Sequence, residues 1–193
     1  MYDLPIAKLV AGVDEAGRGP LAGSVIAAAV ILNQPHSITG LTDSKKLCAQ
    51  KRGEIEEQIK QYSIAWAIGE ASCAEIDKIN ILQASLLAMK RAILQLTPVP
   101  GQALIDGNRV PDIPGITLRA IVKGDLYEPC ISAASILAKE YRDRQMVKLD
   151  QQYPQYRFAQ HKGYPTQLHR SLLKKYGASP VHRTSFKPVR EVI

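Results

Sequence analysis

Three apolar runs in this chain each end at or near an acidic residue, and this repeated pattern constrains the fold more than any other feature. The runs are Leu9 to Val13, Ala103 to Ile105 and Ile116 to Val122, followed in turn by Asp14-Glu15, Asp106 and Asp125. Short apolar runs bounded by turn residues are typical of buried strands that end in loops. Because the ligands of α/β sheets bind outside the strand ends, we expect the four acids to share one crevice.

Four carboxylates in one crevice predict a metal site. An acid next to a glycine is, taken alone, more typical of an ordinary turn. Four acids in one crevice indicate more than ordinary turns, because like charges cannot all stay ionised there without cations. Hard divalent ions with oxygen ligands are the usual solution in proteins. The pattern therefore predicts Mg²⁺ or Mn²⁺ at these four carboxylates.

The turn Gly17-Arg18-Gly19 follows directly after the first acid pair. Its glycines let the backbone approach a ligand closely, and the guanidinium of Arg18 can contact a phosphate through a forked hydrogen bond. A P-loop for nucleotide binding requires Lys and Ser or Thr at the positions of Arg18 and Gly19, so the sequence does not fit a P-loop. Gly17, Gly19 and Gly23 also lack the spacing of a dinucleotide-binding fingerprint. Metal chemistry beside phosphate recognition indicates a nucleic-acid enzyme.

Length and composition limit the class of protein. A chain of 193 residues that is 46% hydrophobic can bury one sizeable core, so we expect a single domain over residues 1–193, with 150–193 as a helical and basic appendage. The 25 basic residues against 18 acidic ones favour a polyanionic partner. Three widely spaced cysteines, no signal-like N-terminus and no long apolar run predict a cytoplasmic protein without membrane attachment. We expect a monomer by default.

The pattern of elements predicts an α/β fold. Strands are expected at Ser24 to Leu32 and Ser63 to Gly69 besides the three runs above, and helices at Leu47 to Tyr62, from Asn80 to before Pro98, Ile131 to Leu149 and Gln167 to Tyr176. Ser72-Cys-Ala-Glu75 forms a predicted capping box. Because early strands follow one another directly and later ones alternate with helices, a mixed sheet is expected.

Several motifs together resemble bacterial type 2 ribonuclease H, also called ribonuclease HII. They are DEAGRGPLAG at 14–23, TDSKKL at 42–47, IDGN at 105–108, VKGD at 122–125, ISAASILAK at 131–139, RDRQM at 142–146, HKGYPT at 161–166 and HRTSF at 182–186. The resemblance runs in order from about Leu9 to Val189. It implies the ribonuclease H-like fold, a mixed five-stranded sheet flanked by helices with a C-terminal helical region. It also implies hydrolysis of RNA that is paired with or joined to DNA.

The resemblance further implies roles for individual residues. Asp14, Glu15, Asp106 and Asp125 match the four catalytic and metal-binding acids of the family. Two metal ions about 4 Å apart would activate a water and stabilise the departing oxygen, leaving a 5′-phosphate and a 3′-hydroxyl. The Gly17-Arg18-Gly19 turn would read the 2′-hydroxyl, and Tyr164 would pack on the sugar at the junction with DNA. Considered alone, Tyr164 could equally be an aromatic side chain that packs the tail.

Phosphate contacts are expected from Lys46 and, on weaker grounds, from Arg142. Ser132 and Ser135 could touch the site, although satisfied helix hydroxyls are the preferred interpretation. Two departures from the family pattern lie in the tail: Arg157 stands where glycine is usual, and Thr184 replaces a basic residue.

Two other functions share parts of this pattern. A type 3 ribonuclease H shares the acid site but carries an N-terminal substrate-binding domain, for which the first acid at position 14 leaves no room. A non-catalytic nucleic-acid-binding module on the same fold would be expected to lack at least one acid, and all four are present.

Overall fold

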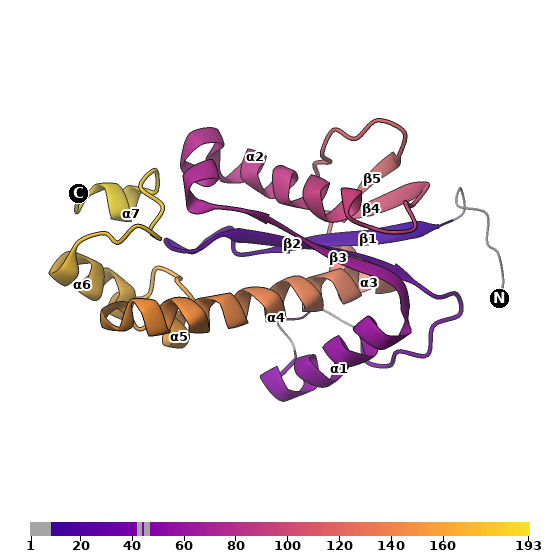
Figure 1. Ribbon diagram of the computed structural model, residues 1–193, viewed down its shortest axis with the longest axis horizontal. Coiled ribbons are helices and arrows are strands. Elements are labelled where there is room, and N and C mark those ends of the chain that lie inside the picture. The colour runs from indigo at the N-terminus through magenta and orange to yellow at the C-terminus, as the bar shows by residue number, and fades with distance from the viewer. Residues whose placement is uncertain (1–8, 42–43, 45–46) are drawn as a thin grey trace.

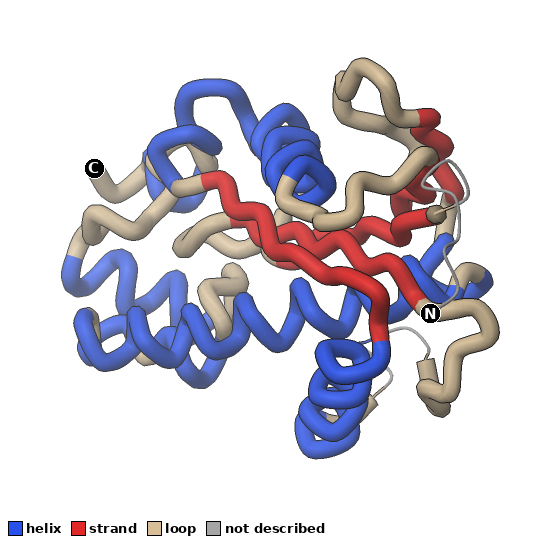
Figure 2. Tube along the Cα trace, turned by 45° about the vertical axis from the view of Figure 1, so that its right-hand side comes forward, coloured by secondary structure: helices blue, strands red, loops and turns tan. Residues whose placement is uncertain are grey.

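A mixed five-stranded sheet forms the centre of the protein, whose computed structural model describes residues 9–41, 44 and 47–193. The strand order is β3-β2-β1-β4-β5, and Figure 2 shows these strands in red. Their bounds are β1 Val10–Ala16, β2 Val25–Leu32, β3 Ser63–Ala71, β4 Gln102–Asp106 and β5 Thr117–Ile121. All five predicted strands are confirmed, with shifts of a few residues at their ends.

Strand direction changes at β1. β1 pairs antiparallel with β2, which pairs antiparallel with β3, whereas β1–β4 and β4–β5 are parallel. The predicted mixed sheet is therefore confirmed. In the parallel pair, Val13 lies opposite Ile105. The next residue of each strand is Asp14 in β1 and Asp106 in β4. These two acids therefore lie side by side on neighbouring strands.

Helices cover both faces of the sheet. Helix α2 (Cys73–Leu94) lies on one face, and α1 (Ala49–Tyr62) and α4 (Pro129–Gln152) lie on the other, as Figure 1 shows. A separate buried apolar cluster fills each interface. Gly12 of β1 permits close packing of α4, because an added Cβ would lie 2.1 Å from the carbonyl carbon of Cys130. Gly69 of β3 has the same role toward α2, where an added Cβ would lie 2.0 Å from the Ala88 oxygen.

Both predicted helix starts near the beginning of α2 are confirmed. Ser72 and Glu75 form the reciprocal capping box. Asn80 has φ 67° and kinks the helix, and its Oδ1 accepts from the backbone N–H groups of Leu82 and Gln83. The side chain thus caps the second segment, as an N-cap residue does.

The C-terminal region packs against one end of the sheet and α4. It contains η3 (Pro154–Tyr156), α5 (Phe158–His161), α6 (Gln167–Tyr176) and α7 (Lys187–Arg190), while the short helix α3 (Gly124–Tyr127) precedes α4. The bounds predicted for α6 are confirmed. Arg157 adopts the left-handed conformation, with φ 56°. This conformation favours glycine, which explains why glycine is usual there in the resembling family. In the described part of the chain, no helix is both long and apolar enough to cross a membrane.

Candidate active site

A cavity of about 300 Å³ opens where β1 and β4 end, and we call it the acid cavity. Its walls come from β1 and the following turn, the end of β4, helix α4 and the loop before α6. The lining residues are Asp14, Glu15, Ala16, Gly17, Arg18, Gly19, Ser44, Asp106, Ser135, Lys139 and Tyr164. Three of the four predicted acids and the whole predicted recognition turn therefore face one space.

Strand geometry explains which face each acid occupies. Successive side chains of a strand point to opposite faces, so Asp14 lies on the same face as Gly12, toward α4. Asp106 shares that face, because it follows Ile105, which belongs to the core on the α2 side. Glu15 alternates to the α2 side, where it lines a second cavity of about 60 Å³ that it shares with Asp106. Asp14 and Asp106 thus lie on the α4 face of the strand ends, and Glu15 lies on the α2 face.

Burial and mutual repulsion make the ionised acids costly. Asp14 is only 6% exposed, and burial, together with the negative charges of Glu15 and Asp106, raises its pKa well above the usual value. Burial also raises the pKa of Glu15, although Arg18 opposes this through an Nη1–Oε1 contact of 3.2 Å. A hydrogen bond from Ser135 favours the charged form of Asp14. One arginine and one hydroxyl therefore only partly compensate the acids.

Asp125 stands beside the acid cavity. The backbone N–H of Gly124 donates to Oδ1 of Asp106 at 2.7 Å, which ties the start of α3 to the end of β4. The Ser132 hydroxyl donates to the Asp125 carbonyl at 2.6 Å and holds this turn against α4. Among the described residues that line the acid cavity, Asp125 does not occur. The structure thus brings three acids to the cavity, and Asp125 directly follows Gly124, whose N–H contacts Asp106.

The acids present fit a divalent cation. The Oε2 atom of Glu15 is buried and has no hydrogen-bond partner among the described residues, and the neighbouring carboxyl of Asp14 has a strongly raised pKa. A hard cation that prefers oxygen ligands would bind the free oxygen of Glu15 and stabilise the ionised form of Asp14. Within residues 9–41, 44 and 47–193, no three His, Cys, Asp or Glu side chains form a closed metal-binding group.

Arg142 differs from the sequence-based expectation. It is 1% exposed and donates through Nη2 to the carbonyl of Ala22 at 3.3 Å. A Cβ added to Gly17, whose φ is +99°, would lie 2.1 Å from Nε of Arg142. The side chain therefore fills the space beneath the recognition turn, and its burial argues against the predicted phosphate contact. Its position on the buried side of α4 could not be seen from its charge.

Tyr164 reaches the acid cavity from the loop before α6. Its side chain is 43% exposed, and its ring lies near Gly19, where an added Cβ would be 3.6 Å from Cε1. The guanidinium carbon of Arg142 lies 5.9 Å from the ring centroid. Tyr164 is thus an accessible aromatic wall of the cavity, not a buried packing residue of the tail.

The structure adds residues that the sequence alone did not select. Ser135 lines the acid cavity and contacts Ser44 across it, with 3.0 Å between their hydroxyl oxygens, so the preferred interpretation of Ser135 as a plain helix hydroxyl was wrong. Lys139 also lines the cavity, and Asp143 holds its ammonium. Lys46 lies outside the described residues, so its phosphate contact stays a prediction.

Comparisons with known proteins agree with this geometry. The family model described as "Ribonuclease HII" matches residues 11–189. The ribonuclease HII of Polynucleobacter asymbioticus is 57% identical over 188 residues, which cover 95% of each chain. The chain belongs to the ribonuclease HII family. It is therefore a ribonuclease H, an endonuclease whose substrate is nucleic acid.

Solved structures of ribonucleases H share the fold. The ribonuclease H2 of Pyrococcus horikoshii has a TM-score of 0.80 and 27% identity, covering 95% of this chain and 96% of that one. The structure described as Bst-RNase HIII in complex with Mn²⁺ has a TM-score of 0.65 and 15% identity, covering 100% of this chain and 73% of that one. At that identity the second likeness shows the fold alone.

In this ribonuclease HII family member, a buried histidine cluster supports the Tyr164 loop. His161 stacks on His169 with 4.3 Å between ring centroids, and Phe158 packs against His169 edge-on at 5.6 Å. His182 completes the cluster with its Nε2 3.1 Å from Nε2 of His169. The histidine cluster thus lies in the core of the C-terminal region.

The hydrogen bonds of the histidine cluster require neutral rings. Nδ1 of His169 donates to the carbonyl of Tyr164 at 3.0 Å, so its Nε2 has no proton and accepts from His182. Nδ1 of His182 in turn accepts from the backbone N–H of Ser179 at 3.0 Å. Protonation of either ring would add a proton where a bond is accepted. A charged ring would therefore lose the His182–His169 bond or the Ser179–His182 bond.

Acid is expected to destabilise this region. Burial lowers the pKa of His169 and of His182 to about 4, whereas a histidine in an unfolded chain has a pKa of about 6.5. Between these values the unfolded chain binds protons that the folded chain excludes. The contribution of the two histidines to the free energy of unfolding should therefore be fully retained above pH ~6.5 and fall toward pH ~4, by up to about 1.4 kcal/mol per pH unit for each histidine. Urea unfolding across this pH range measures the slope.

The variant His36→Asn provides the matched control, because His36 lies outside the histidine cluster. It should keep the pH slope of the wild type, and His182→Asn should reduce the slope. A pH slope that stays the same in His182→Asn as in the wild type would contradict a neutral buried cluster.

Proposed function

We propose that this ribonuclease H cuts on the 5′ side of single ribonucleotides embedded in duplex DNA and also hydrolyses the RNA strand of RNA–DNA hybrids. The products are a 5′-phosphate and a 3′-hydroxyl. The observation that carries the proposal is the shared cavity: three acids and the Gly17-Arg18-Gly19 turn line the same space. The acids alone would indicate metal binding. The adjoining turn adds backbone N–H groups that can recognise the sugar.

Asp14, Glu15, Asp106 and Asp125 would hold two Mg²⁺ or Mn²⁺ ions. When bound, such ions supply a hydroxide-like water and stabilise the charge on the departing oxygen. The chain's own contribution is to keep Asp14 and Asp106 on adjacent strand ends and to orient Asp106 through the Gly124 N–H. Arg18, which is half exposed at the rim, is suited to a phosphate contact.

Recognition of the ribonucleotide would come from two sides of the acid cavity. Backbone N–H groups of the Gly17-Arg18-Gly19 turn can donate to a 2′-hydroxyl at close range, and the 2′-hydroxyl is what separates RNA from DNA. Tyr164, which lines the same cavity next to Gly19, would pack on the next sugar. One ribonucleotide would then be sufficient for recognition, and a run of several would not be needed.

Replacing Asp14 by Asn should abolish cleavage while the protein stays folded. The change removes a metal ligand and also a repelled, buried charge, so the metal-free variant should melt no lower than the wild type. Its melting temperature should no longer rise when Mg²⁺ or Mn²⁺ is added. Gel analysis of cleavage and thermal melting with metal or chelator measure both effects.

Asp112→Asn is the matched control, because it makes the same chemical change at an exposed carboxylate. It should keep both the cleavage rate and the metal-induced rise in melting temperature. Near-normal cleavage by the Asp14→Asn protein would overturn the assignment of this acid as a metal ligand.

Replacing Tyr164 by Ala should strongly depress cleavage of a duplex with one embedded ribonucleotide. The ring contacts sugar in this proposal, not metal, so the affinity for Mn²⁺ should stay the same. Tyr164→Phe should retain most activity because it keeps the ring. Single-turnover cleavage and a Mn²⁺ titration are the two measurements.

Tyr62→Ala controls for the loss of an exposed aromatic ring, since Tyr62 is 45% exposed and belongs to α1. If Tyr164→Ala and Tyr62→Ala cut the substrate at the same rate, Tyr164 is only a wall of the cavity. If the wild type ignores a single ribonucleotide altogether, the proposed substrate is wrong.

A further inference from the structure

The Gly17-Arg18-Gly19 turn is held from beneath by Arg183, which belongs to the segment between α6 and α7. Arg183 is fully buried, and its guanidinium donates to four backbone carbonyl oxygens. These are Nη2 to Gly17 at 2.6 Å, Nη1 to Arg18 at 3.0 Å, Nε and Nη2 to Gly23 at 2.9 and 2.7 Å, and Nη2 to Ser24 at 3.2 Å. One side chain thus connects the turn to the residues just before β2.

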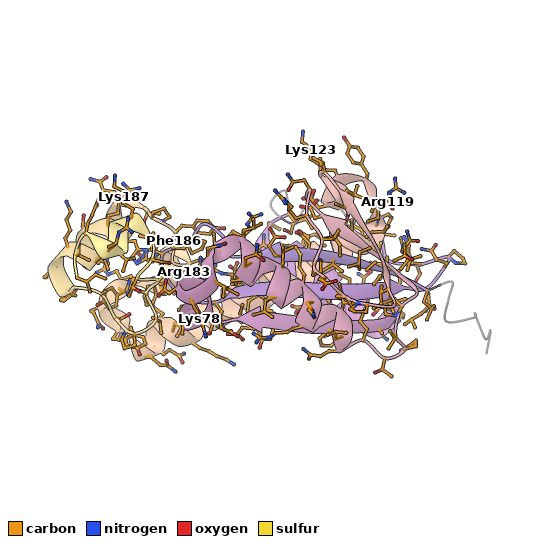
Figure 3. All side chains as sticks on the ribbon, turned by 90° about the horizontal axis from the view of Figure 1, so that it is seen from above. Lys78, Arg119, Lys123, Arg183, Phe186 and Lys187 are labelled. Carbon is orange, nitrogen blue, oxygen red and sulfur yellow. The ribbon has the colours of Figure 1, made fainter. Side chains whose placement is uncertain are left out.

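The backbone around Arg183 is itself fixed. Its N–H donates to the carbonyl of Leu21 at 2.8 Å, and the neighbouring His182 forms an antiparallel bridge with Ala22. The guanidinium carbon lies 5.2 Å from the ring centroid of Phe186. Figure 3 shows Arg183 and Phe186 where the C-terminal region meets the rest of the molecule. The side chain of Arg183 therefore extends toward the turn from a backbone segment that is held in place.

The carbonyl contacts determine where the N–H groups of the turn point. In a trans peptide the C=O and N–H bonds of one unit point in opposite directions. Drawing the carbonyls of Gly17 and Arg18 inward therefore turns the N–H groups of Arg18 and Gly19 away from Arg183, and both residues line the acid cavity. Among the described residues, neither N–H has a hydrogen-bond acceptor.

Arg142 adds a second constraint on the same turn. Its side chain occupies the space next to Gly17, and its buried Nε has no partner in the part of the chain that the structure describes. Burial beside this second cation lowers the pKa of Arg183 to about 10, so Arg183 still carries its charge at neutral pH. Two buried guanidinium groups under the turn leave it little freedom to flip its peptide units.

We propose that Arg183 is a positioning residue for ribonucleotide recognition. By binding the carbonyls of Gly17 and Arg18, it presents the N–H groups of Arg18 and Gly19 to the 2′-hydroxyl in the acid cavity. This inference rests on the proposed function, since it names the residue that organises its recognition turn. It also assigns a reason for the C-terminal segment to pack where it does.

The variant Arg183→Lys tests the proposal because it keeps the charge but replaces a planar fork by a single ammonium group that cannot reach all four carbonyls. The matched control is Asp77→Ala. Asp77 accepts from the backbone and hydroxyl groups of Thr184 and Ser185, so its loss loosens the same segment without removing a contact to the turn. Both variants are measured as the full chain, at a temperature where thermal melting shows them folded.

Two readouts are compared. In the metal-free protein, NMR resonances of the Arg18 and Gly19 amides should shift or broaden in Arg183→Lys and stay as in the wild type in Asp77→Ala. For a duplex with one ribonucleotide, kcat should fall on the order of 100-fold in Arg183→Lys alone, because misplacement by about 1 Å has effects of this size. KM and the Mn²⁺ affinity should stay unchanged, since phosphate contacts and carboxylates are intact.

Unchanged amide resonances in Arg183→Lys, or a loss of kcat equal to that of Asp77→Ala, would overturn the positioning role. A wild type that does not cut the single-ribonucleotide duplex would instead overturn the proposed substrate. In that case the amide resonances still decide whether Arg183 orients the turn.

Discussion

The parallel pairing of β1 with β4 is the interaction on which the site depends. With Val13 opposite Ile105, the next residue of each strand is an acid, and both acids point to the α4 face. A shift of one residue in this register would send one carboxylate to the other face of the sheet. The register is secured by burial on both faces, with α4 packed closely on Gly12 and α2 on Gly69. The helices thus fix the acids although they contribute few groups to the cavity.

The site combines two buried charge systems that are adjacent but separate. Asp14 and its neighbours concentrate negative charge where the strands end, and Arg142 and Arg183 place positive charge beneath the following turn. Both the carboxylates and the guanidinium groups are costly to bury, and their charges are compensated in different ways. Backbone carbonyls accept from the guanidinium of Arg183 and, at 3.3 Å, from that of Arg142, whereas Oε2 of Glu15 has no hydrogen-bond partner among the described residues and could bind a cation. The chain therefore completes its own recognition turn but leaves its carboxylates suited to an external ion.

Local patterns predicted the strands, most helices and the acids, because apolar periodicity and turn residues act over a few positions. The bounds of α6 and the capping box at Ser72 are local in this sense, and both are confirmed. Arg142 and Arg183 could not be placed in the same way. Their contacts with the turn join residues more than 100 positions apart, and an arginine in a basic tail carries no local signal that it is buried. Ser135 was misjudged for the same reason, since its contact with Ser44 crosses the fold.

The central claim is that the carboxylates at the ends of β1 and β4 hold divalent cations. Its most direct measurement is anomalous X-ray scattering from crystals of the protein soaked in MnCl₂, compared with crystals of Asp106→Asn treated identically. The account predicts anomalous peaks within the acid cavity, between Asp14, Glu15 and Asp106, in the wild type and their loss or weakening in the variant. Peaks only at other acidic positions, or equal peaks in both crystals, would contradict it.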